Sequence, residues 1–109
     1  MMMKNVAIAA GAAVLALGAY TPASANEGLA ASKGCVACHQ VKPTGAPALG
    51  PVFTDVAARY KGDAAAEAML VERVIKGGDG HWQTLMPAMP PNNVTEAEAK
   101  KLVQWVLSL

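Results

Sequence analysis

The chain has 109 residues, enough for one small domain, and its 9 basic and 8 acidic side chains nearly balance. A near-neutral chain without a clustered basic face is not expected to bind nucleic acid. The hydrophobic content of 53% is raised by the first 20 residues, so it does not indicate a membrane protein.

The first 25 residues are typical of a secretory signal peptide. Lys4 provides a short positive start, residues 6–20 are an uncharged apolar run, and residues 23–25 (Ala-Ser-Ala) have the form of a cleavage site. The run is shorter than the ~20 residues that a membrane-spanning helix needs. We therefore expect cleavage after Ala25, export to the periplasm without stable membrane insertion, and a mature domain at residues 26–109.

The predicted mature domain is small and carries almost no net charge. Loss of the leader removes one charge, Lys4, and leaves 84 residues with 8 basic and 8 acidic side chains. A domain of this size usually needs disulfides, a metal or a cofactor to supplement its apolar core.

Both cysteines of the chain belong to one motif, Cys35-Val36-Ala37-Cys38-His39. Cys-x-x-Cys-His is a pattern of covalent c-type haem attachment. If the segment is helical, Cys35 and Cys38 share a face and can both bond to the vinyl groups of one porphyrin. His39 can then ligate the iron as the proximal ligand. Haem of this type is attached outside the bacterial cytoplasm, in agreement with the leader.

Other interpretations of Cys-x-x-Cys remain open, namely a zinc site, a dithiol redox pair or a small disulfide loop. A zinc site needs four ligands, and beyond the motif the remaining candidate of the usual kind is His81. A thioredoxin-like dithiol pair belongs to a pattern of strands and crossovers, which the sequence lacks. Haem attachment is the favoured interpretation.

Four helices and no strand of useful length are predicted, so the fold class is all-α. Asn26 is a favourable N-cap for the first helix, residues 95–98 (Thr-Glu-Ala-Glu) form a capping box before the last, and Gly77 suits a left-handed helix end. The helices near the two mature termini are expected to pack together. The expected ranges are 26–33, 52–61, 64–76 and 95–108, with the inward face of the last at Leu102, Val103, Trp105, Val106 and Leu109.

Two long loops separate these helices, and the second contains the candidates for a second iron ligand. Residues 40–51 hold three prolines and two glycines, and residues 77–94 hold Met86 and Met89 among prolines. Prolines pre-order the backbone, which favours a methionine as ligand, with Met89 preferred over Met86 and His81. His/Met ligation raises the iron potential and leaves no open position, which suits electron transfer.

An ordered set of short stretches carries a family resemblance. On these stretches the chain resembles the small bacterial class I cytochromes c of the c-551/c-552 type over residues 27–109. They are residues 34–39, Gly50-Pro51 leading to residues 55–58, residues 73–76, Trp82, Met89-Pro90-Pro91-Asn92, and residues 105–108.

The resemblance implies a class I cytochrome c fold of about four helices around one covalently bound haem c. It implies that Met89 is the distal ligand and that the Pro51 carbonyl accepts a hydrogen bond from His39 Nδ1–H. It also implies that Arg73 and Trp82 donate hydrogen bonds to a haem propionate. We expect a monomeric electron carrier, not an enzyme, with transient redox partners: a quinol-oxidising complex or another cytochrome upstream and an oxidase or reductase downstream. A sensor or enzyme domain with a displaceable distal ligand is the alternative. The loop before Gly50 is longer than usual in that family, and Met86 is an additional methionine.

Overall fold

The computed structural model describes residues 23–109, so residues 1–22 of the predicted leader lie outside the described part. Four α-helices dominate, which confirms the all-α prediction. They are α2 (Ala23–Ser32), α3 (Phe53–Arg59), α4 (Ala66–Lys76) and α5 (Glu96–Leu107), with a 3₁₀ turn η2 (Cys35–Ala37) and short strands β1 (Gly78–Asp79) and β2 (Ala88–Met89). Within residues 23–109 no helix has both the length and the apolar character to cross a membrane.

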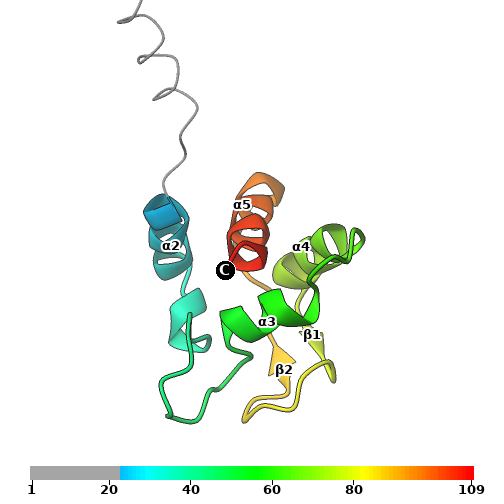
Figure 1. The fold of residues 1–109 in the computed structure, drawn as a ribbon. Helices are drawn as coiled ribbons and strands as arrows, with labels where there is room; N and C mark the ends of the chain where they lie inside the picture. The colour runs from blue at the N-terminus through cyan, green and yellow to red at the C-terminus, as the bar shows by residue number, and fades with distance from the viewer. Residues whose placement is uncertain (1–22) are drawn as a thin grey trace, which may run out of the picture.

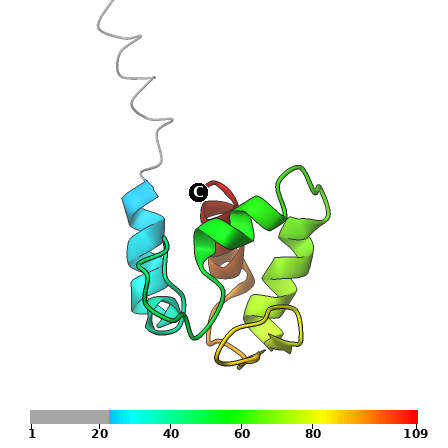
Figure 2. The same cartoon turned by 60° about the horizontal axis from the view of Figure 1, so that its bottom comes forward.

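Helix α5 is the centre of the fold, because it contacts α2, α3 and α4 (Figure 1). Figure 2 shows α2 and α4 on either side of it, with α3 crossing between them. The buried side chains of α5 are Ala99, Leu102, Val103, Trp105 and Val106. Leu109, expected on the same face, is 41% exposed because it follows the end of the helix.

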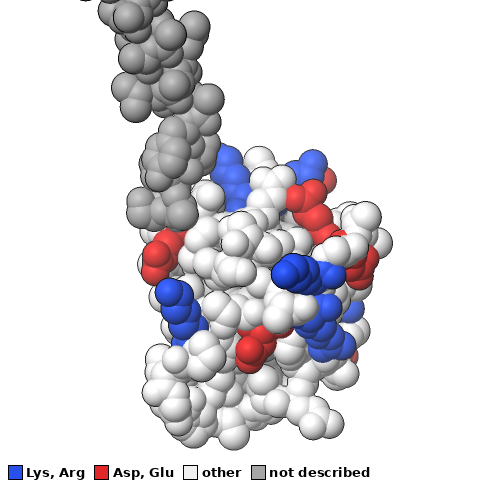
Figure 3. Space-filling model, viewed as in Figure 1, with Lys and Arg blue, Asp and Glu red and all other residues white. Residues whose placement is uncertain are grey.

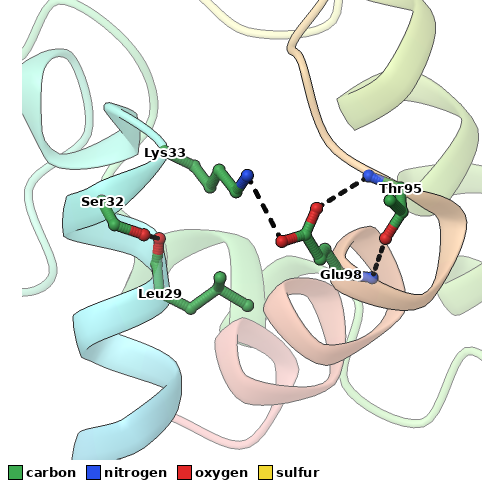
Figure 4. A network of polar contacts seen from close by, with 5 residues as sticks. All are labelled: Leu29, Ser32, Lys33, Thr95 and Glu98. Carbon is green, nitrogen blue, oxygen red and sulfur yellow. Dashed lines mark hydrogen bonds and ion pairs between the residues drawn. The ribbon is translucent and has the colours of Figure 1, made fainter.

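The two terminal helices pack together as predicted, and a polar contact joins their ends (Figure 4). Lys33 Nζ lies 3.3 Å from Glu98 Oε2. The other carboxylate oxygen of Glu98 accepts from the Thr95 N–H, while the Thr95 hydroxyl accepts from the Glu98 N–H. The predicted capping box is therefore confirmed, and its Glu98 also pairs with the residue that follows α2.

The element boundaries differ from the expectations in several places, among them the end of α3 at Arg59, before the expected 61. Helix α2 begins at Ala23, so Asn26 lies inside it and does not cap it; the alanines before Asn26 favour helix. Helix α4 begins at Ala66, after a turn in which Asp63 Oδ1 accepts from the Ala65 N–H. Gly77 ends α4 with φ 80° and ψ 176°, so its φ is positive but it is not in the left-handed helical region.

The second loop contains a short strand pair that the sequence did not reveal. Strands β1 and β2 are antiparallel, with Gly78 opposite Met89 and Asp79 opposite Ala88. Two residues a strand are too few for an alternating pattern to show in the sequence. The pair fixes the backbone of Met89 relative to the end of α4.

Candidate haem-binding site

A cavity of about 260 Å³ lies between the helices and the two long loops. Every residue that the sequence analysis assigned to the site lines it. These residues are Cys35, Cys38, His39, Pro51, Arg73, Trp82 and Met89, and the rival ligands His81 and Met86 line it as well. The remaining lining residues are mainly apolar, among them Phe53, Val56, Leu70, Leu102 and Trp105.

The Cys-x-x-Cys-His segment forms a tight turn directly after α2. Gly34, with φ 80°, precedes the 3₁₀ turn, and the Cys35 carbonyl accepts from the N–H groups of Cys38, at 3.2 Å, and His39, at 3.0 Å. This local winding is what brings both cysteines and His39 to one cavity. The helical geometry on which the haem interpretation depended is present as a single turn.

The Cys35 thiol lacks the lowered pKa that a dithiol redox pair uses. Cys35 and Cys38 are unbridged, with Cys35 half-buried and Cys38 exposed. Burial raises the pKa of the Cys35 thiol, outweighing a backbone hydrogen bond that lowers it. A catalytic dithiol needs a thiolate of lowered pKa, so the shift runs opposite to that chemistry.

His39 is oriented by two neighbours. Its Nδ1 lies 2.7 Å from the carbonyl oxygen of Pro51, which only accepts, so Nδ1 carries the proton and Nε2 keeps its lone pair. Its ring stacks on Phe53, with centroids 4.8 Å apart and planes at 17°. Burial lowers the pKa of His39 against the opposing effect of the Pro51 carbonyl, which favours the neutral form that binds metals.

Met89 and Met86 lie on the same loop but in different surroundings. Met89 is half-buried and belongs to β2, whereas Met86 is 48% exposed and its N–H donates to the Leu49 carbonyl at 2.9 Å. Both line the cavity, so lining alone does not separate them. Burial and the strand pairing favour Met89.

Arg73 and Trp82 each contact a residue that sequence reasoning did not assign to the site. Arg73 Nη1 donates to the Tyr60 hydroxyl at 3.2 Å. The guanidinium of Arg59 lies 4.5 Å from the Trp82 ring centre, and its Nη1 donates to the His81 carbonyl at 2.7 Å. Arg59 was missed because its partners are far along the chain, and no spacing rule connects them.

The residues present fit a covalently held haem. Two thiols, a neutral imidazole with a free Nε2 and a thioether line one largely apolar cavity, which is the donor set that a His/Met-ligated haem c uses. Among residues 23–109, no group of three or more His, Cys, Asp or Glu side chains converges as metal ligands. The described part of the chain thus offers no positive support for the zinc alternative.

The comparisons with known proteins agree with this site. The sequence profile of the family described as "Cytochrome c" matches residues 25–109. The chain is 49% identical over 85 residues to cytochrome c-552 of Hydrogenobacter thermophilus, covering 78% of this chain and 82% of the relative. It is 44% identical over 95 residues to cytochrome c-551 of Pseudomonas aeruginosa, covering 87% and 85%.

A solved structure shows the same architecture. The crystal structure of wild-type Nitrosomonas europaea cytochrome c552 superposes with a TM-score of 0.67 at 38% identity, covering 76% of this chain and 98% of that one. Together with the family match, this similarity accounts for essentially the whole described domain, and the chain belongs to the cytochrome c family.

Proposed function

We propose that the chain is a periplasmic one-electron carrier whose axial iron ligands are His39 and Met89. As a cytochrome c it carries one covalent haem c, and its function is electron transport. The observation that supports the ligand assignment is one cavity lined by Cys35, Cys38, His39 and Met89 together.

The haem supplies a one-electron ferric/ferrous couple. The chain holds the two ligands from rigid surroundings: His39 between the Pro51 carbonyl and the Phe53 ring, and Met89 in the β1–β2 pair. Rigid ligands favour fast transfer, because little rearranges when the charge on the iron changes. Arg73 and Trp82, which line the same cavity, would donate to a haem propionate and so influence the potential.

We further propose that redox partners dock on the uncharged end of the molecule. Residues 43–54 and 80–95 contain no Lys, Arg, Asp or Glu, and Figure 3 shows this lower end without charged side chains on the face in view. Leu49, Leu85 and Met86 are exposed there, at 38%, 65% and 48%. A small apolar contact suits transient redox complexes, which bury less than ~1,200 Å². An upstream quinol-oxidising complex and a downstream oxidase or reductase are the expected partners.

Visible spectra of the matured protein and two matched variants test the ligand assignment. Sharp α and β bands after reduction, with colour that survives acid–acetone extraction, are expected of covalent low-spin haem. Met89→Ala should abolish the far-red iron–sulfur charge-transfer band, while Met86→Ala should keep it. The reverse result would make Met86 the ligand.

Two further measurements test the alternative functions. Rapid carbon monoxide binding to the reduced protein at neutral pH would indicate a displaceable distal ligand and favour a sensor or enzyme. Two titratable thiols in a colourless denatured protein would instead favour a dithiol oxidoreductase.

A further inference from the structure

Gly77, the residue that directly follows α4, lies unusually close to the backbone of the Met89 segment. Its N–H donates to the Arg73 carbonyl at 2.8 Å, and its φ is +80°. A β-carbon at this position would lie 2.5 Å from the Met89 carbonyl oxygen and 3.0 Å from backbone atoms of Pro90 and Pro91. The 2.5 Å distance is too short for a β-carbon unless the backbone at Met89 moves, and the 3.0 Å distances are tight contacts.

This closeness distinguishes Gly77 from the other described glycines. Gly34, Gly45, Gly62 and Gly80 also have positive φ, but a β-carbon on any of them would meet nothing within 4 Å. At Gly78 the nearest atoms, on Arg73 and His81, lie at an ordinary 3.7 Å, and at Gly50 the obstacle is the His39 side chain. Among the described glycines, Gly77 is thus the one at which the backbone of another segment occupies the space that a β-carbon would need.

The segment that Gly77 touches has little freedom to retreat. Gly78 pairs with Met89 on one side, and Asn92 Nδ2 donates to the Val74 carbonyl at 2.8 Å on the other. Pro90 and Pro91 between these anchors have fixed φ values. Because the segment is held at both ends, pressure at its middle has to move Met89 itself.

We propose that Gly77 is a positioning residue for the distal ligand: the absence of a side chain lets residues 89–91 lie against the end of α4, and this contact sets how far the Met89 thioether reaches into the cavity. The inference rests on the proposed assignment of Met89 as the ligand. Gly77 acts through the backbone of Met89 and contributes no side chain to the cavity.

Displacement of Met89 from ferric holoprotein by added imidazole tests this role. In Gly77→Ala the added side chain strains the position of Met89. Imidazole should therefore bind roughly tenfold more tightly, a change equivalent to about 1.4 kcal/mol. The far-red iron–sulfur band should also shift or weaken, and the reduction potential should fall as the thioether bond weakens.

Two alanine variants serve as matched controls. Gly62→Ala introduces a side chain at a similar φ, +78°, in open space between α3 and α4. Gly28→Ala adds the same side chain within α2, where nothing lies within 4 Å. Both should keep the parent's imidazole affinity and far-red band, whatever they cost in thermal stability.

Equal imidazole affinity and equal bands in Gly77→Ala and the controls would overturn the inference, because Gly77 would then be a helix terminator only. If Gly77→Ala does not accumulate, the double variant with Met89→Ala decides: recovery supports the proposal, and failure of both overturns it. A parent protein without the far-red band would instead refute the ligand assignment. The two failures are therefore distinguishable.

Discussion

Replacing Arg59 by alanine should loosen the loop that carries Trp82, although Arg59 is exposed and lies at the end of α3. The variant removes a guanidinium 4.5 Å from the Trp82 ring centre and a 2.7 Å hydrogen bond to the His81 carbonyl. An exposed cation–π contact contributes ~0.5–1 kcal/mol, and we assign about 1 kcal/mol to the exposed hydrogen bond. The expected loss is about 1.5 kcal/mol, which lowers the Tm of so small a domain by roughly 6–12 °C.

Thermal unfolding of the holoprotein, followed by circular dichroism, measures this loss. Lys61→Ala is the matched control, because it removes the same charge two residues away, at an exposed position. Arg59→Lys should recover only part of the loss, since an ammonium cannot stack as a planar guanidinium does.

A double-mutant cycle with Trp82→Leu isolates the stacking contribution. The coupling free energy between positions 59 and 82 should be about 0.5–1 kcal/mol. A coupling indistinguishable from zero, or equal losses in Arg59→Ala and Lys61→Ala, would show that the stacked geometry contributes nothing to stability.

Three further outcomes are expected. Phe53→Leu keeps most of the buried volume but loses the stack on His39 and the edge contact with Trp105. The free energy of unfolding, measured by denaturant titration, should therefore fall by about 1–3 kcal/mol. An unchanged free energy would mean that the ring contacts contribute nothing to stability. The Thr95 N–H, and after it Lys33, hold the pKa of Glu98 below its usual 4.5, so the ionised form is favoured in the folded protein and its contribution is lost as the pH falls through that lowered value. The Tm difference between the parent and Glu98→Gln should therefore be largest near neutral pH and vanish in acid, and a constant difference would contradict the pairing. Electron-transfer rates with a partner should depend only weakly on salt, because the proposed docking end is uncharged; a steep fall in stopped-flow rates would place docking on a charged face.

The sequence predicted those features that local chemistry determines. The four helices, the capping box of α5 and the pairing of the terminal helices follow from composition, periodicity and capping residues. The assigned cavity residues could be named in advance because each belongs to a short stretch with a recognisable order. Met89 stayed the preferred ligand over Met86 on the basis of resemblance, and the structure adds burial and strand pairing in its favour.

The features that were missed depend on contacts between distant segments. The closeness of Gly77 to Met89, the stack of Phe53 on His39 and the position of Arg59 over Trp82 arise only when loops and helices meet. The sequence around a glycine that ends a helix does not show whether solvent or the backbone of another segment lies next to it. The early start of α2 was missed for a different reason: a favourable capping residue, Asn26, competes with alanines that favour continuation of the helix.

Because α2 packs on α5, the first helix of the described domain cannot complete its packing until the last one is available. Under the proposed export, the chain crosses the membrane N-terminus first, so Cys35 and Cys38 reach the far side well before α5 does. Until then α2 lacks the helix it packs on, and the interior that α5 supplies cannot close. Attachment of haem before α5 arrives would join both thiols to it on an unassembled chain, and α5 would then close the pocket around it.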